Sequence, residues 1–110
     1  MKPTLKPLKF VGSSQDDIRD FPEAVRRAIG TELMVVQFGG APSDFKPMSS
    51  VGAGAYEVRV RIDGAWRAIY VAQFADAVYV LHAFQKKTQK TSKGDIDLAA
   101  ARYKLIAGKP

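Results

Sequence analysis

Residues 56 to 84 constrain the fold more than any other part of the chain. They begin with strictly alternating apolar and polar residues, which predict a strand with one buried and one polar face. Asp63-Gly64 follows, a strong signal for a hairpin turn, and residues 66 to 74 supply the return strand. A second tight turn at Asp76-Ala77 leads into the apolar run Val78–Phe84. Three strands joined by short turns predict an antiparallel meander.

Short elements precede this meander. Residues 5 to 11 alternate apolar and basic side chains, and Pro7 restricts such a strand to a sheet edge or a strand start. A serine cap and acidic residues at positions 13 to 18 predict a short helix. We therefore expect an edge strand followed by a helix.

A stronger helix signal comes next. Asp20 as N-cap and Pro22 in the first turn predict a helix over residues 21 to 37, with one apolar stripe. Gly39-Gly40 end this helix. Gly30 lies inside it and lowers helix stability by up to about 1 kcal/mol relative to alanine. We expect either a close packing partner or a slight break at Gly30.

A loop and a final helix complete the expected elements. Residues 39 to 55 are rich in glycine, proline and serine, which indicates a loop. A loop of about 15 residues is often functional or mobile, and a plain connector is the alternative. Residues 94 to 107 predict a helix with acids in its first turn. Its expected apolar side consists of Leu98, Ala101, Leu105 and Ile106.

The composition limits the chemistry. A chain of 110 residues suits one domain with its own core. It has no cysteine and one histidine, which excludes thiol nucleophiles, zinc-thiolate sites and histidine-rich metal centres. No window approaches the roughly 18 apolar residues of a membrane span, and the segment Met1–Thr4 contains no apolar leader. We therefore expect a cytoplasmic protein that does not enter the membrane.

Positive charge gathers in the second half of the chain. Residues 1 to 55 carry 7 basic and 6 acidic side chains, whereas residues 56 to 110 carry 10 and 5. The densest cluster follows the apolar run and consists of Lys86, Lys87, Lys90 and Lys93. Such a cluster favours a polyanion, with nucleic acid the first choice. The alternative is that these lysines keep a sheet edge soluble.

Three segments of this region are distinctive: residues 56 to 61 (YEVRVR), 66 to 70 (WRAIY) and 80 to 91 (VLHAFQKKTQKT). They resemble the RelE/HigB toxin superfamily, and most closely its phage-derived HigB-like branch. The order of elements agrees over almost the whole chain. The resemblance implies an α+β fold with a twisted, mainly antiparallel four-stranded sheet. The N-terminal helices would cover one face, a C-terminal helix would follow, and a basic concave face would stay open.

The resemblance also implies a function. Members of the superfamily are toxins of type II toxin-antitoxin systems that cut mRNA on the ribosome, generally in the A site. They need no metal or other cofactor, and an antitoxin with a helix-turn-helix fold neutralises them. A non-catalytic relative that binds RNA or an antitoxin without cleaving is the alternative.

Four cations carry the site that the resemblance implies. Arg59 falls on a catalytic lysine of better-known members, and Arg67 on a catalytic arginine. Lys86 or Lys87 falls on the cation that holds the phosphate. The chemistry agrees, because fixed guanidinium groups stabilise the dianionic phosphorane-like state of RNA cleavage. Ordinary cross-strand pairing of the arginines with Glu57 or Asp76 is the alternative.

Glu57 departs from the family pattern. Better-known members carry a second lysine at this position, so Glu57 is either the base or a group that orients Arg59 or Arg61. Tyr103 lies too far along the chain to match the C-terminal tyrosine or histidine of some members. The general acid and base therefore stay unassigned.

His82 is a further catalytic candidate. Its ordinary pKa near neutrality suits acid-base catalysis, but its place between Leu81 and Ala83 also suits a core residue. Arg61, Lys90 and Lys93 are expected to contact the RNA backbone. Three aromatic residues either stack on bases or belong to the core: Trp66, Tyr70 and Phe84.

Overall fold

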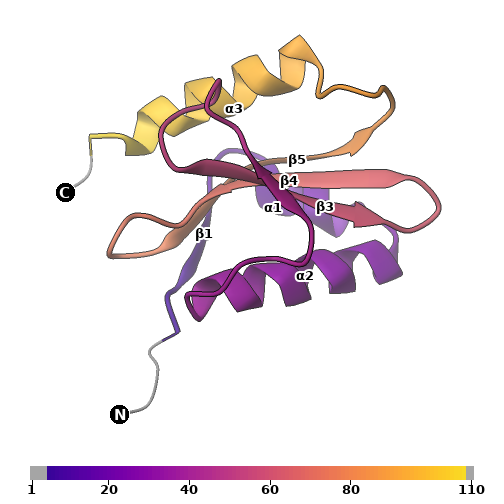
Figure 1. Cartoon of the computed structure of the whole chain (residues 1–110), viewed down its shortest axis with the longest axis horizontal. Coiled ribbons are helices and arrows are strands. Elements are labelled where there is room, and N and C mark those ends of the chain that lie inside the picture. The colour runs from indigo at the N-terminus through magenta and orange to yellow at the C-terminus, as the bar shows by residue number, and fades with distance from the viewer. Residues whose placement is uncertain (1–4, 109–110) are drawn as a thin grey trace.

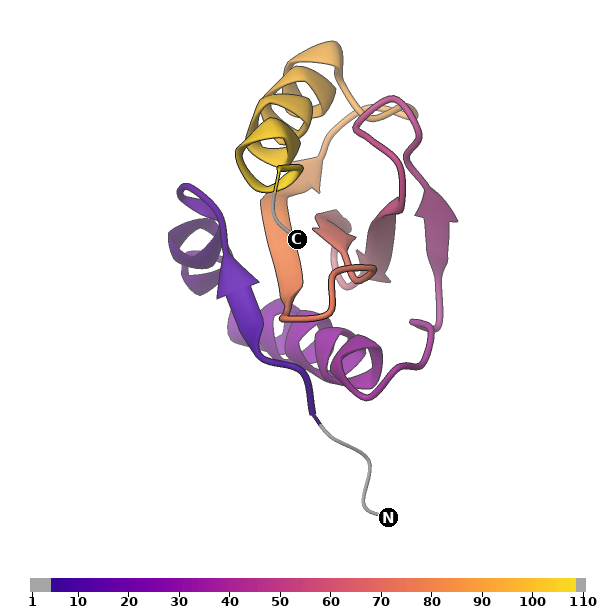
Figure 2. The same cartoon turned by 90° about the vertical axis from the view of Figure 1, so that its left-hand side faces the viewer.

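Helices cover both faces of a five-stranded sheet in the computed structural model, which describes residues 5–108 (Figure 1). The strands are β1 (Leu8–Phe10), β2 (Phe45–Pro47), β3 (Ala55–Arg61), β4 (Ala65–Val71) and β5 (Val78–Lys86). The helices are α1 (Ser14–Arg19), α2 (Glu23–Gln37) and α3 (Lys93–Ile106). α2 packs on one face of the sheet and α3 on the other (Figure 2). The segment Met1–Thr4, considered above for a leader, lies outside the described residues.

The strand order in the sheet is β1-β5-β4-β3-β2. The last three strands of the chain form the predicted antiparallel meander. In its first turn, Asp63 and Gly64 both have positive φ, 46° and 132°. β1 pairs with β5 in parallel at one edge, which confirms the expected edge strand. The α+β class is confirmed, but the expected four-stranded sheet is wrong, because the sheet has five strands and is mixed.

The fifth strand, β2, lies inside the segment that the sequence predicted to be a loop. It pairs antiparallel with β3 and places Lys46 opposite Glu57. Three residues between glycines, prolines and serines are too few to establish an alternating pattern. Pro47 is tolerated because β2 forms the outer edge of the sheet.

A β-bulge in β5 decides which side chains reach each face. Tyr70 pairs with Val80, whereas its neighbour Ile69 pairs with His82, so Leu81 is the extra residue. One extra residue reverses the alternation of side chains beyond it. The even-numbered residues of β5 therefore lie on the α2 side before the bulge and on the α3 side after it.

The α2 side of the sheet holds the larger apolar core. α2 contributes four residues that are at most 4% exposed: Val25, Ile29, Leu33 and Val36. Burial of each such side chain contributes about 1.5 to 3 kcal/mol. The predicted stripe is thus confirmed. Gly30 faces open space within a continuous helix, so neither the expected packing partner nor the expected break is present.

The helix starts differ from the predicted caps. α2 begins at Glu23 with Pro22 as N-cap, and no side chain caps it. Asp20 is not the cap because it is the C-terminal cap of α1 and has helical dihedral angles. Ser13 holds the N-cap position of α1, but its hydroxyl donates to the Asp17 carboxylate and makes no side-chain cap bond.

The buried side of α3 also differs from the prediction. Ala99 and Ile106 are buried, with Ile96 and Tyr103 packed beside them. Of the expected apolar side, Leu98 is 40% and Leu105 72% exposed, because the helix presents the stripe 96, 99, 103 and 106 to the sheet. Within residues 5–108, no helix is both long and apolar enough to cross a membrane.

Candidate functional site

The open end of the α3-side sheet face brings the predicted cations together. In the register of the sheet, Arg59 pairs with Arg67, and Arg67 with Phe84. Lys86 lies two residues further along β5, on the same face as Phe84, because strand side chains alternate. These residues come from three neighbouring strands, so the site depends on the sheet rather than on one loop.

Glu57 lies at the centre of this cluster and is fully buried. Its Oε1 is 3.3 Å from Arg67 Nε and 3.8 Å from Arg59 Nε. Its Oε2 accepts a hydrogen bond of 2.7 Å from the Thr91 hydroxyl. A carboxylate with no exposed surface does not reach a substrate in this arrangement. Glu57 is thus paired with Arg59 and Arg67, whereas the sequence left it either as the base or as a group that orients Arg59 or Arg61.

Arg67 is 3% exposed and is fixed from two sides. Besides its ion pair with Glu57, its Nη1 donates to the Trp66 carbonyl at 3.0 Å. Burial lowers the pKa of the Arg67 guanidinium below its usual value, and the Glu57 carboxylate partly opposes this. The group stays charged at neutral pH because arginine does not deprotonate in proteins. A fixed, poorly solvated cation suits the stabilisation of developing negative charge.

Among residues 5–108, three buried polar atoms of this cluster have no hydrogen-bond partner: Glu57 Oε1, Arg59 Nε and Arg67 Nε. They contact one another only as ion pairs, at 3.8 and 3.3 Å. Arg59 keeps 29% of its side chain exposed, and Asp44 Oδ1 lies 3.9 Å from its Nη1. Arg59 is thus the accessible member of the arginine pair, and Arg67 is the buried one.

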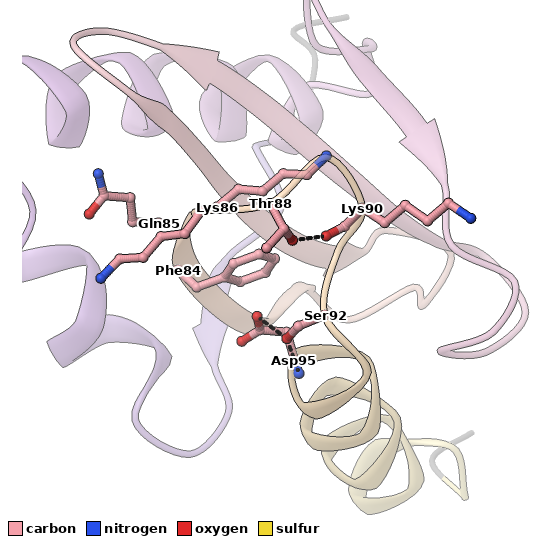
Figure 3. Close-up of a pocket in the computed structure, with 8 residues that line it drawn as sticks. Phe84, Gln85, Lys86, Thr88, Lys90, Ser92 and Asp95 are labelled. Atoms are coloured by element: carbon pink, nitrogen blue, oxygen red, sulfur yellow. Dashed lines mark hydrogen bonds between the residues drawn. The ribbon is translucent and has the colours of Figure 1, made fainter.

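A cavity of about 190 Å³ lies where β5 leaves the sheet (Figure 3). Its lining consists of Phe84, Gln85, Lys86, Lys87, Thr88, Lys90, Ser92 and Asp95. Burial lowers the pKa of the Lys86 ammonium, and the Arg67 guanidinium lowers it further. Lys86 therefore lines the cavity and also interacts with the charge of Arg67 in the arginine cluster.

The other cations that the sequence singled out lie at three different places in the structure. Lys93 does not line the cavity and forms an exposed ion pair of 3.0 Å with Asp97. Arg61 is exposed at the end of β3, on the same face as Arg59. Lys87 and Lys90 are exposed at the rim of the cavity.

His82 lies on the same sheet face as Phe84 and is only 6% exposed. Its Nε2 is 2.7 Å from Asp95 Oδ1, and its ring stacks on Phe84 at a centroid distance of 4.9 Å. Its Nδ1 is buried and has no hydrogen-bond partner among residues 5–108. His82 is absent from the cavity lining, so it contacts that space only through Asp95 and Phe84.

The three aromatic candidates separate into two groups. Trp66 packs on Phe21, and Tyr70 on Tyr56, within the α2-side core. Burial raises the pKa of Tyr70 to about 12. Phe84 alone of the three lines the cavity. Trp66 and Tyr70 are therefore core residues.

Sequence reasoning did not single out four residues of this region: Asp44, Lys46, Thr91 and Asp95. Lys46 faces the same side as its partner Glu57, and its charge contributes to the lowered pKa of Lys86. β2 thus supplies a lysine beside the position where better-known members carry one on β3. No sequence pattern predicts that Lys46 lies beside Glu57, because the register of a three-residue strand is set only in the folded sheet. The capping pattern Ser92-x-x-Asp95 was the one available signal for Asp95.

Residues 16–104 match the family model described as Phage derived protein Gp49-like (DUF891). The chain belongs to this phage-derived Gp49-like family. The Gp49-like family is part of the RelE-like toxin group. A search of the curated proteins gave no match. Within residues 5–108, no group of three or more histidine, aspartate and glutamate side chains is arranged to hold a metal ion.

Proposed function

We propose that this Gp49-like protein is the toxin of a type II toxin-antitoxin pair and cleaves mRNA on the ribosome without a metal ion. The observation that carries the proposal is the convergence of Arg59, Arg67 and Lys86 on the open end of one sheet face. Membership in a RelE-like toxin family supports the same function. We place the protein in the HigB-like branch, with a helix-turn-helix antitoxin as its protein partner.

In the proposed reaction, the ribose 2′-oxygen forms a bond to the adjacent phosphorus, and the bond from phosphorus to the 5′-oxygen breaks. The 2′-oxygen loses its proton and the 5′-oxygen gains one, which leaves a 2′,3′-cyclic phosphate and a 5′-hydroxyl. Charge builds up on the phosphoryl oxygens between these steps. The accessible guanidinium group of Arg59 would contact those oxygens, and the buried guanidinium group of Arg67 would add positive charge behind it.

Glu57 and Lys86 have supporting roles in this proposal. Glu57 holds the two guanidinium groups at fixed positions, so they need little reorganisation when the charge develops. Lys86 would contact the phosphate, and its lowered pKa makes it a better proton donor to the 5′-oxygen than an ordinary lysine. Lys46 adds a fourth cation from the neighbouring strand.

Induced expression tests the proposal in cells. The wild-type protein should arrest growth, and the variant R59A/K86A should not. The control variant R26A/R27A removes two exposed cations from α2, far from the site in the fold. It should be as toxic as the wild type. Full toxicity of R59A/K86A at equal protein level would contradict the site.

One observation favours a second function, RNA or antitoxin binding without cleavage. The buried Glu57 carboxylate neutralises part of the charge of Arg59 and Arg67, where better-known members carry a lysine. A protein of this kind would bind RNA in a salt-dependent way but leave ribosome-bound message intact. Primer extension separates the two functions, because only the nuclease creates new ends in the message.

A further inference from the structure

We propose that the cavity between β5 and the start of α3 is a nucleobase pocket that selects a guanine next to the scissile phosphate. This inference rests on the proposed RNA substrate and deepens it by naming a base. Its essential residues are Phe84, Ser92 and Asp95, with His82 behind them. The residues at its rim are the lysines at positions 86, 87 and 90.

The cavity has the size and wall of a base-binding pocket. Its volume of about 190 Å³ lies below the 300 to 1,000 Å³ usual for drug-sized ligands, so it suits one base rather than a whole nucleotide. The Phe84 ring borders the space, as Figure 3 shows. His82 stacks on Phe84 with an interplanar angle of 25°, which fixes the orientation of the ring. Phe84 belongs to the α3-side core and is 9% exposed, so the accessible part of its ring would contact a base that enters the cavity.

Asp95 provides the selective group. Its Oδ1 lies 2.7 Å from His82 Nε2, and its Oδ2 accepts a hydrogen bond of 2.7 Å from the Ser92 hydroxyl. These two contacts fix the carboxylate plane while 29% of the side chain remains exposed. Each carboxylate oxygen has a second lone pair, so Asp95 can still accept bonds from a base. A polar group held by packed neighbours in this way is suited to discrimination between ligands.

The lysines of the pocket would orient the RNA backbone relative to the bound base. Lys86, Lys87 and Lys90 also line the cavity, and their charges would hold the sugar-phosphate backbone while the base enters. Phe84, which lines the pocket, pairs with Arg67 in the register of β4 and β5. This register puts the pocket next to the arginine cluster, so the selected base would lie beside the bond that breaks.

The carboxylate favours guanine over the other bases. Guanine presents two adjacent donors, N1–H and the N2 amino group, which match two carboxylate oxygens. Adenine and cytosine each pair one amino donor with a ring acceptor that the carboxylate repels. Uracil has one N–H between two carbonyl acceptors. A good bidentate pair of this kind is typically worth about 1 to 3 kcal/mol of discrimination between bases.

Binding of 2′-O-methyl RNA tests the pocket without relying on cleavage. The probes are four pentanucleotides, UUXUU, in which X is G, A, C or U. The wild-type protein should bind the G probe about tenfold more tightly than the U probe, within the range of one bidentate contact. Asp95→Asn presents one acceptor and one donor and should lose most of this preference. Asp97→Asn, the control on the exposed side of α3, should keep it.

Two further variants guard against a folding artefact. Ser92→Ala keeps the Asp95 carboxylate but removes one of the two hydrogen bonds that orient it. The preference for G should therefore weaken. Phe84→Leu should weaken binding of all four probes and leave their order unchanged. Thermal melting verifies that each variant is folded.

The possible failures are distinguishable. Tight binding with equal affinity for the four probes, or a folded Asp95→Asn variant that keeps the preference for G, overturns the pocket and leaves the nuclease proposal standing. Absence of any RNA binding, together with intact ribosome-bound message, overturns both.

Discussion

The two faces of the sheet differ in how they combine stability and chemistry. The α2 face is apolar throughout, and the helix residues that cover it are nearly inaccessible. The α3 face is apolar only beneath α3, and its other end buries a carboxylate between two arginines. The comparison shows that one face can be filled with apolar side chains while the other, beside its own apolar core, tolerates a buried charged cluster.

The largest effect is expected from Glu57→Gln on the α3 face. This change keeps the shape and the contact to Thr91 but leaves the 3%-exposed Arg67 without its countercharge. Removing one partner of a buried ion pair destabilises a protein by about 3 to 5 kcal/mol. The urea midpoint should therefore fall sharply, whereas the control Asp63→Asn in the exposed hairpin turn should leave it unchanged. An unchanged midpoint for Glu57→Gln would show that the charged cluster is not held as described.

On the α2 face, Ile29→Ala should cost nearly as much. Ile29 is 1% exposed, and truncation of such a residue usually costs about 2 to 5 kcal/mol. The matched control is Leu105→Ala on α3, where the side chain is 72% exposed and the free energy of unfolding should barely change. Chemical denaturation of both variants compares them directly. Equal losses of unfolding free energy in the two variants would contradict the exposed position of Leu105.

The sequence predicted the α2 face better than the α3 face, for physical reasons. The α2 stripe and the alternation of β3 are local periodicities, and burial follows them directly. β2, the bulge at Leu81 and the buried side of α3 depend on pairing and packing between distant segments. The register of the sheet places Arg59 opposite Arg67, and Arg67 opposite Phe84, two residues before Lys86. The hydrogen bond between Thr91 and the buried Glu57 depends on the fold and has no local signal in the sequence. The contact of Lys93 with RNA stays a prediction, and in the structure Lys93 forms an exposed ion pair with Asp97.

His82→Gln should have an intermediate effect and should act mainly on stability. The imidazole lies 2.7 Å from Asp95 and is nearly buried, so mispairing there should cost about 1 to 3 kcal/mol. Urea midpoint and single-turnover cleavage are measured on the same preparation. A normal midpoint combined with a rate loss of about 10² to 10⁴, the usual size for a lost acid-base group, would instead make His82 catalytic.

The smallest expected effect concerns the titration of Lys86. Burial and the Arg67 guanidinium both disfavour its charged form, so its pKa lies below the usual lysine value and its ammonium deprotonates at lower pH. Arg67→Gln removes one of these causes and should move the Lys86 titration to higher pH. Side-chain NMR of the Lys86 methylene groups follows this change. A shift to lower pH, or none in a folded variant, would contradict the electrostatic link between the arginines and the cavity.

Primer extension on ribosome-bound message tests the central claim most directly. Purified wild-type protein should produce new ends at the A site. Arg59→Lys keeps the charge beside Glu57 but loses the guanidinium fork of the accessible arginine, and it should lower the cleavage rate by about 10² to 10³, as removal of one transition-state donor usually does. Intact message with the wild-type protein, accompanied by salt-sensitive RNA binding, would contradict the nuclease and favour a binding module.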